Sequence, residues 1–215
     1  MKFLALAWDL DGTLADTADD LTASLNHLRV LEGLAPLAVA EVRHLVGDGA
    51  AMLVRRGLSP VDEEAQARYV RQFLEHYRDH CCDHAVLMPG ALETLDALTE
   101  LPQAIATNKP MEYTEPILRH LGVEGRFAAV YGAGSVPNRK PHPDMILAIA
   151  AQLGVPPFSI LMIGDSANDI RSARAAGAKS CAVSGGYKTI EELRPENPDY
   201  TVEHLRDIVD LVKGA

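Results

Sequence analysis

Short uninterrupted runs of hydrophobic residues recur along the 215-residue chain, and each run predicts a strand that is buried on both faces. The first run extends from Phe3 to Trp8. Four similar runs and a weaker sixth follow it, at residues 103–107, 128–131, 160–164, 179–183 and 200–202. Helical periodicity separates them, most clearly at residues 91–101, 143–153 and 166–176. This alternation predicts an α/β fold in which a doubly wound parallel sheet carries helices on both faces.

Residues 15–85 interrupt the alternation, because their hydrophobic positions recur only at helical spacing. Ser59 and Pro60, followed by acidic residues at 62–64, predict the start of one helix with Ser59 as its N-cap. A Pro-Gly pair at residues 89–90 marks the return to the alternating pattern. We therefore predict a Rossmann-like core domain of residues 1–14 and 86–215 and an inserted all-helical cap domain of residues 15–85.

The overall charge narrows the range of partners. The chain carries 30 Asp and Glu residues against 20 Lys and Arg residues, a formal net charge of −10. Because this charge repels a polyanion, no nucleic-acid partner is expected. A small phosphorylated substrate stays compatible with it, since a metal ion or a few local cations reverse the field inside one cleft. The sequence leaves both a monomer and a homodimer open.

The hydrophobic runs of this sequence are too short to cross a membrane, which takes about 18 consecutive apolar residues. The apolar stretch between Lys2 and Asp9 holds six residues, fewer than a signal peptide needs. Cys81, Cys82 and Cys181 are an odd set with two adjacent members, which is a poor basis for disulfides. We therefore expect a cytoplasmic protein with no membrane partner.

Polar side chains gather where the predicted strands end, which is the edge at which open α/β sheets bind their ligands. Acidic residues follow the first and fourth strands, a Thr-Asn pair follows the second, and one lysine precedes the helix that leads to the fourth. The members of this set are Asp9, Asp11, Thr107, Asn108, Lys140, Asp165 and Asp169. Their placement predicts that several carboxylates converge at one mouth of the sheet.

Such a cluster of carboxylates requires a cation, because two like charges about 4 Å apart repel by roughly 4 kcal/mol at an effective dielectric constant near 20. Oxygen ligands favour Mg²⁺, whereas zinc prefers the His and Cys side chains that these strand ends lack. Lys140 adds a second positive charge, and Thr107 supplies a hydroxyl donor. The predicted site therefore suits a phosphate group, with Mg²⁺ as the cofactor.

The first strand end has the residues for phosphoryl transfer. An aspartate beside a metal, such as Asp9, can attack phosphorus as a carboxylate nucleophile and form an aspartyl-phosphate that water then cleaves. A second carboxyl two residues on, Asp11, can protonate the leaving alkoxide and later deprotonate the attacking water. Gly12 permits a sharp turn after the strand, so that backbone amides between Leu10 and Gly12 can point at phosphate oxygens.

Taken alone, each of these motifs also fits a turn or a helix cap. Together and in this order, they resemble the four motifs of the haloacid dehalogenase superfamily. Asp9-Leu-Asp-Gly-Thr-Leu14 resembles the first motif, Thr107 the second, Lys140 the third and the segment 164–169 the fourth. The resemblance implies Asp9 as nucleophile, Asp11 as general acid and base, and Thr107 and Lys140 as groups that stabilise the phosphate.

The resemblance also implies a metal set and a lid. Mg²⁺ would be held by Asp9, the carbonyl of Asp11 and Asp165, and Asp169 would be an acid in the metal site or next to it. The helical insertion resembles the small cap that closes over the site in this superfamily. A small phosphorylated metabolite is the implied partner.

Within the superfamily, the sequence is most similar to the phosphoglycolate phosphatase group, through its segments 16–21, 46–49, 107–110 and 184–187. Cap residues are expected to select the substrate, because a closing lid presents them to the leaving group. Gly47 and Gly49 can offer backbone amides, and Arg55 or Arg56 can meet a carboxylate with two hydrogen bonds. Lys109, which lies beside the phosphate threonine, is a further candidate for substrate contact.

Several alternatives share part of this pattern. Phosphatases that act on sugar phosphates, N-acetylmuramate 6-phosphate, nucleotides or pyrophosphate stay open. A mutase resembling β-phosphoglucomutase usually has His where Leu21 stands, and a dehalogenase would lack Asp11. A signalling receiver domain phosphorylates an Asp after its third strand, where this chain has Gly132, and it lacks an inserted cap. We therefore expect a Mg²⁺-dependent phosphomonoester hydrolase.

Overall fold

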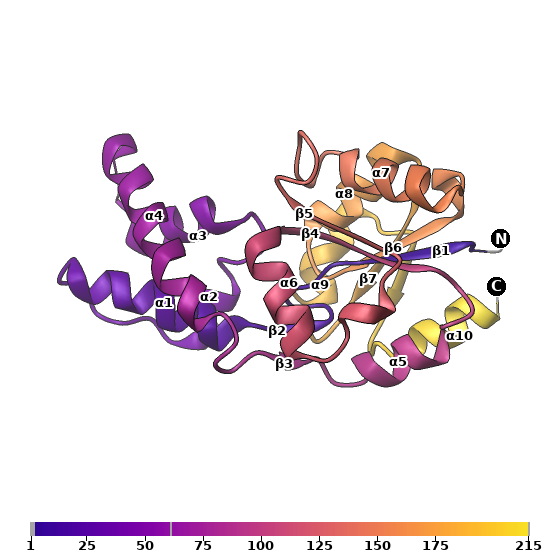
Figure 1. The fold of residues 1–215 in the computed structure, drawn as a ribbon, viewed down its shortest axis with the longest axis horizontal. Coiled ribbons are helices and arrows are strands. Elements are labelled where there is room, and N and C mark those ends of the chain that lie inside the picture. The colour runs from indigo at the N-terminus through magenta and orange to yellow at the C-terminus, as the bar shows by residue number, and fades with distance from the viewer. Residues whose placement is uncertain (1–2, 61, 215) are drawn as a thin grey trace.

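The structure is a computed structural model that describes residues 3–60 and 62–214 (Figure 1). Within these residues, six parallel strands form one sheet in the order β5-β4-β1-β6-β7-β8. In that order the strands are Ala129–Ala133, Gln103–Pro110, Ala5–Trp8, Ile160–Gly164, Lys179–Val183 and Tyr200–Val202. The predicted doubly wound parallel sheet is confirmed.

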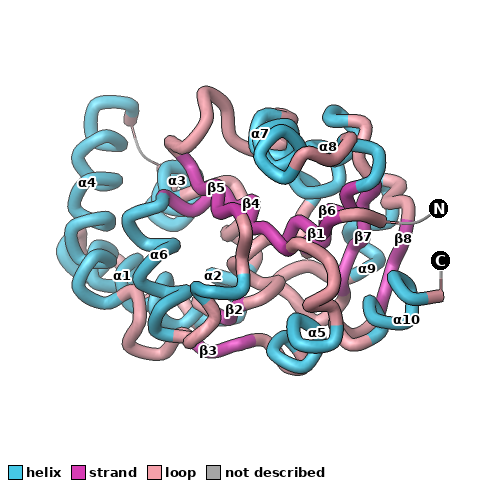
Figure 2. Tube along the Cα trace, turned by 45° about the vertical axis from the view of Figure 1, so that its right-hand side comes forward, coloured by secondary structure: helices cyan, strands magenta, loops and turns pink. Residues whose placement is uncertain are grey.

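Helices cover both faces of the sheet, and the side chains of β1 show why. Leu6 and Trp8 belong to one buried hydrophobic cluster, whereas Ala5 and Ala7 belong to another, because successive side chains of a strand point to opposite faces. Figure 2 shows α7 and α8 on one face and α5 and α10 on the other. The helices of the core are α5 (Ala91–Ala97), α6 (Met111–His120), α7 (Asp144–Leu153), α8 (Ala167–Ala176), α9 (Ile190–Leu193) and α10 (Asp207–Lys213).

The register of the central strands sets the ends of β1 and β6 beside the middle of β4. Trp8, the last residue of β1, pairs with Ile105 of β4 on one side and with Ile163 of β6 on the other. Asp9 and Asp165, which follow β1 and β6, therefore lie beside Thr107, which the structure places within β4 and not after its end. No helix within the described residues is long and apolar enough to cross a membrane.

A second group of helices lies beyond this edge of the sheet, at the left of Figure 1. Its members are α1 (Ala18–Leu31), α2 (Val39–Arg43), α3 (Ala50–Leu58) and α4 (Glu63–His80). We call these helices and the loops that join them the cap. The chain enters the cap through β2 (Ala15–Asp16) and leaves it through β3 (Val86–Leu87), and these two strands pair antiparallel. The boundaries that the sequence predicts, at residues 15 and 85, fall next to this ribbon.

The start of α4 differs from the prediction. The N-cap is Asp62, whose carboxylate accepts a hydrogen bond from the amide of Ala65 at 2.6 Å. The prediction of Ser59 as N-cap was therefore wrong. Asp62 stands three residues before the amide that it caps, which is the spacing that a capping side chain needs, whereas Ser59 ends α3 as its C-cap residue.

Candidate active site

Three buried carboxylates converge at the carboxyl edge of the sheet. Within the described residues, oxygens of Asp9, Asp165 and Asp169 lie within 4.8 Å of one another. The parallel pairing of β1 with β6 sets this arrangement, since the amide of Asp9 continues the ladder by donating to the carbonyl of Ile163 at 2.9 Å. Asp165 follows the end of β6, and Asp169 lies in the first turn of α8.

Lys140 lies inside this cluster. Its ammonium donates to Asp169 at 2.5 Å, to Asp9 at 2.9 Å and to the carbonyl of Ala106 at 2.6 Å. Burial by itself lowers the pKa of this ammonium, but the charges of Asp169 and Asp9 outweigh that effect and raise the pKa above its ordinary value. Lys140 is therefore charged and neutralises part of the acidic cluster.

The negative charges of the three carboxylates exceed the single positive charge of Lys140. Burial, followed by the charge of Asp169, raises the pKa of Asp9 to about 7, and burial, followed by the charges of Asp9 and Asp169, raises the pKa of Asp165 to about 8. These shifts mean that the folded chain disfavours the charged carboxylates on its own. A divalent cation at these oxygens would remove the repulsion, and the oxygen-only donor set suits a hard ion.

The backbone makes room for this arrangement. Gly12 has a φ of +83°, and a Cβ atom on it would overlap the carboxylate of Asp165. A Cβ on Gly186 would meet Asp165 as well. Asp165 is held in place by the hydroxyl of Thr13 at 3.0 Å and by the amide of Tyr187 at 2.7 Å. The cradle around Asp165 therefore requires glycine on two sides, which fits a carboxylate that is fixed to bind an ion.

Asp11 points away from the cluster. Its Oδ1 accepts hydrogen bonds from the hydroxyl of Thr17 at 2.5 Å and from the ammonium of Lys109 at 3.0 Å. Of the four residues predicted for the metal site, the structure brings the side chains of Asp9, Asp165 and Asp169 together. Asp11 was predicted to contribute its backbone carbonyl, and its side chain lies on the side that faces the cap. This placement separates the carboxylate of Asp11 from the three carboxylates of the cluster.

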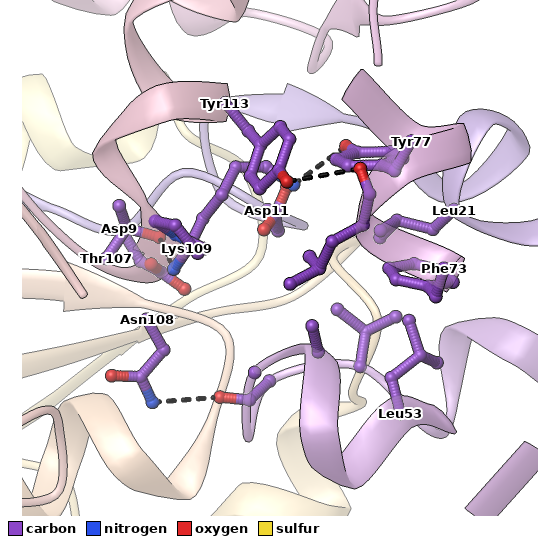
Figure 3. Close-up of a pocket in the computed structure, with 16 residues that line it drawn as sticks. Asp9, Asp11, Leu21, Leu53, Phe73, Tyr77, Thr107, Asn108, Lys109 and Tyr113 are labelled. Carbon is purple, nitrogen blue, oxygen red and sulfur yellow. Dashed lines mark hydrogen bonds and ion pairs between the residues drawn. The ribbon is translucent and has the colours of Figure 1, made fainter. Parts of the chain in front are cut away.

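A pocket of about 40 Å³ extends from Asp9 and Asp11 towards the cap (Figure 3). Thr107, Asn108 and Lys109 of β4 form its core wall, and mostly hydrophobic side chains form its cap wall. The lining residues are Asp9, Asp11, Leu21, Val46, Gly47, Gly49, Ala50, Leu53, Phe73, Leu74, Tyr77, Thr107, Asn108, Lys109, Pro110 and Tyr113.

The cap loop that contains Gly47 and Gly49 touches the core directly. The carbonyl of Gly47 accepts hydrogen bonds from the side-chain amides of Asn108 and Asn168, each at 3.1 Å. Asn168 also donates to the carboxylate of Asp48 at 2.7 Å. These bonds hold the cap against the strand ends and close one side of the pocket.

Two predicted residues do not present side chains to the pocket. Arg55 is exposed on α3 and is not among the lining residues. The side chain of Leu10 is fully buried in the hydrophobic core, so only its backbone is left to meet a ligand. The other predicted residues of the core, from Asp9 to Asp169, surround the pocket or the acidic cluster.

Sequence reasoning missed several residues of the site. Phe73, Tyr77 and Tyr113 line the pocket, but their spacing in the sequence is that of ordinary core residues of amphipathic helices. Thr13 and Tyr187, which hold Asp165, carry no pattern of their own. The one available signal was position, since Thr13 belongs to the first motif and Tyr187 to the loop after β7.

Comparisons with known proteins agree with this geometry. A family model described as haloacid dehalogenase-like hydrolase matches residues 6–183. A phosphoglycolate phosphatase of Chromobacterium violaceum is 36% identical over 98% of this chain and 97% of its own length. An N-acetylmuramic acid 6-phosphate phosphatase of Pseudomonas aeruginosa is 35% identical over 100% of this chain and 97% of its own length. The crystal structure of a predicted phosphoglycolate phosphatase from Haemophilus somnus matches with a TM-score of 0.90 and 30% identity over 98% of both chains.

Proposed function

The chain belongs to the haloacid dehalogenase-like hydrolases, and we propose that this phosphatase hydrolyses 2-phosphoglycolate with Mg²⁺ as its metal. The observation that carries the proposal is the meeting of Asp9, Asp165 and Lys140 at one mouth of the sheet, beside a small pocket. The resemblance to relatives named phosphoglycolate phosphatase, at 33–36% identity, supports the choice of substrate.

Asp9 and Asp165 would hold the metal together with the backbone carbonyl of Asp11, and Asp169 would keep Lys140 in place beside them. Bound Mg²⁺ would supply positive charge to the phosphoryl oxygens. Lys140, the hydroxyl of Thr107 and the backbone amides between Leu10 and Gly12 would hold the remaining charge of the phosphate.

In the proposed reaction, a carboxylate oxygen of Asp9 attacks phosphorus, and the bond between phosphorus and the leaving oxygen breaks. Asp11 gives its proton to that leaving oxygen, so the product departs as an alcohol. Asp11 then takes a proton from water as the water attacks the aspartyl-phosphate, which releases phosphate and restores Asp9. The position of Asp11, turned from the acidic cluster towards the cap, supports this division of roles.

A second candidate substrate is N-acetylmuramate 6-phosphate, because a relative with that activity in its name is 35% identical. The pocket favours the ester with fewer hydroxyls, because Leu21, Leu53 and Phe73 bound it without polar groups. A sugar with many hydroxyls would leave those hydroxyls without partners against this wall.

The substrate is tested by measuring phosphate release from a panel of esters in Mg²⁺. The panel consists of 2-phosphoglycolate, N-acetylmuramate 6-phosphate, a hexose phosphate, a mononucleotide and pyrophosphate. We expect the highest kcat/KM for 2-phosphoglycolate. A higher kcat/KM for another member would replace it as the substrate, and phosphate release from none of them would contradict the proposed activity.

The acid role of Asp11 has its own test. Asp11→Asn should severely reduce hydrolysis of 2-phosphoglycolate, whose leaving group needs a proton, and should reduce hydrolysis of an activated aryl phosphate much less. Equal losses on the two esters would contradict the role of Asp11 as general acid.

A further inference from the structure

Tyr77 is a cap residue that meets the core inside the pocket. It lies on α4, its side chain is almost fully buried, and it lines the pocket opposite Asp11 (Figure 3). Its phenol oxygen accepts a hydrogen bond from the ammonium of Lys109 at 2.8 Å, and its ring centroid lies 4.7 Å from the same ammonium. Lys109, from β4, is thus held by Tyr77 on one side and by Asp11 at 3.0 Å on the other.

Lys109 and Tyr77 each have a hydrogen atom left to donate in a hydrogen bond. The ammonium of Lys109 has three donor hydrogens, and Tyr77 and Asp11 take two of them. Tyr77 accepts from Lys109, so its own hydroxyl hydrogen remains, and no hydrogen bond within residues 3–60 and 62–214 uses it. Two donors 2.8 Å apart therefore face the same pocket.

Burial keeps the phenol of Tyr77 in its donor form. Burial, followed by the charge of Asp11, raises the pKa of Tyr77 well above its ordinary value, so the phenol holds its proton near neutral pH. The side chain of Lys109 is only 4% exposed, which makes hydrogen bonds to its charge stronger than they would be in water.

The other residues of the pocket wall indicate which chemical group of a ligand these two donors can bind. Lys109 is the sole cation among the described residues that line the pocket. The hydroxyl of the neighbouring Tyr113 already donates to the carbonyl of Leu74 at 3.2 Å. Leu21, Leu53 and Phe73 offer no polar atoms. The wall is therefore suited to one small anionic group and offers no second cation for another phosphate.

We propose that Tyr77 and Lys109 form a two-donor site for a carboxylate on the leaving group, and that Tyr77 is the residue through which the cap selects such esters. One carboxylate oxygen would accept from the Tyr77 hydroxyl and the other from Lys109, a fork that matches the spacing of the two donors. The proposal rests on the proposed phosphatase activity. It extends that activity to a class of substrate: short phosphomonoesters with a carboxylate next to the ester carbon.

The proposed site combines one residue of the core with one residue of the cap. Lys109 belongs to the sheet and Tyr77 to α4, so the fork exists only while the cap lies against the strand ends. A substrate with a carboxylate would bridge the two parts, whereas an ester without the carboxylate would bring no second negative charge to these donors. The carboxylate ester should therefore be favoured in kcat/KM, because hydrogen bonds to a charged acceptor are stronger than those to a neutral one.

The test compares two esters of similar size, 2-phosphoglycolate and 2-hydroxyethyl phosphate, in which a neutral hydroxyl group replaces the carboxylate. The measured quantity is the ratio of their kcat/KM values. Tyr77→Phe keeps the ring and removes the hydroxyl, and it should lower this ratio about 10-fold, the effect of one hydrogen bond to a charged group. Lys109→Met should lower the ratio further, by about 100-fold.

Tyr113→Phe is the matched control. It also removes a phenolic hydroxyl from the pocket wall, but that hydroxyl already donates its proton to the carbonyl of Leu74. It should change the kcat/KM values of both esters alike and leave their ratio where it was. Circular dichroism and thermal unfolding establish that each variant is folded. If Tyr77→Phe also changes both esters alike, Tyr77 is a packing residue and the proposal is overturned.

A measurement on the unaltered chain keeps the proposal testable if Tyr77→Phe does not fold. Glycolate should inhibit the hydrolysis of an aryl phosphate at least about 10-fold more strongly than ethylene glycol does. Equal inhibition by the two would overturn the fork. If the chain releases phosphate from 2-hydroxyethyl phosphate as readily as from 2-phosphoglycolate, the fork fails while the phosphatase stands. If it releases phosphate from no ester, the proposed function itself fails.

Discussion

The two ends of the pocket are built differently. At the end proposed to bind the phosphate, the phosphate end, Asp9 and Asp165 follow the adjacent strands β1 and β6, Thr107 lies in the neighbouring strand β4, and Lys140 is buried between two carboxylates. At the other end, the walls come from cap helices and from α6, and Tyr77 and Lys109 meet across the boundary between cap and core. The sheet thus fixes the reacting groups rigidly, whereas the groups that would face the leaving group depend on where the cap lies. Chemistry and selection should respond to separate sets of substitutions.

The strongest test of this division is Asp9→Asn. We expect hydrolysis to fall on the order of 10⁴-fold or more, because an amide cannot serve as the nucleophile. The thermal unfolding temperature should rise at the same time, since the substitution removes a buried charge that repels Asp165 and Asp169. Phosphate release and calorimetry measure the two effects. Substantial remaining activity would move the nucleophile to another residue.

Metal removal should come next, with a loss on the order of 10³-fold in EDTA that Mg²⁺ reverses. Mg²⁺ should also raise the unfolding temperature of the unaltered chain, because an ion that binds only the folded state stabilises it. Asp165→Asn is the matched control and should abolish this rise. A rise that survives in Asp165→Asn would place the ion away from the acidic cluster.

On the cap side, Asn168→Ala should have a smaller effect. It removes the hydrogen bonds that join α8 to the carbonyl of Gly47 and to Asp48, so the cap should close less often. We expect kcat/KM to fall about 10-fold, mainly through KM. Asn138→Ala, at an exposed amide that contacts Asp144, serves as the control. A loss confined to kcat would instead tie Asn168 to the phosphate end.

The smallest effect is expected for Arg55→Ala. Because Arg55 is exposed and does not line the pocket, kcat/KM for 2-phosphoglycolate should stay within about 2-fold of the unaltered value. Steady-state kinetics decide the matter. A loss of 10-fold or more would return Arg55 to the substrate contact that its sequence position first indicated.

The difference between the two ends also explains what the sequence could predict. The strands at 160–164, 179–183 and 200–202 have the predicted bounds. The first of them is buried at every position and is an uninterrupted apolar run, as expected of a central parallel strand. Once the strands are placed, Asp9 and Asp165, which follow the first and fourth predicted strands, fall at one edge through sheet geometry alone. The convergence of the acids therefore follows from local pattern and topology, and it needs no knowledge of side-chain packing.

The pocket wall could not be predicted in the same way. Tyr77 and Phe73 occupy buried positions of α4, and nothing in their spacing separates a residue that packs against a helix from one that faces a ligand. The orientation of Asp11 depends on two partners: Thr17, which follows β2 and precedes α1, and Lys109, which belongs to β4. Such features arise from contacts between distant segments, which a periodic pattern does not encode.

The ribbon formed by β2 and β3 has a consequence for how such molecules diversify. Ala15 pairs with Leu87 and Asp16 with Val86, so the two ends of the inserted cap segment lie next to each other. A different helical module could be grafted between these residues without rethreading any strand of the sheet. A chimera of this kind would inherit its leaving-group preference from the donor and its reaction chemistry from the recipient, which gives evolution a simple way to create new specificities on an unchanged catalytic framework.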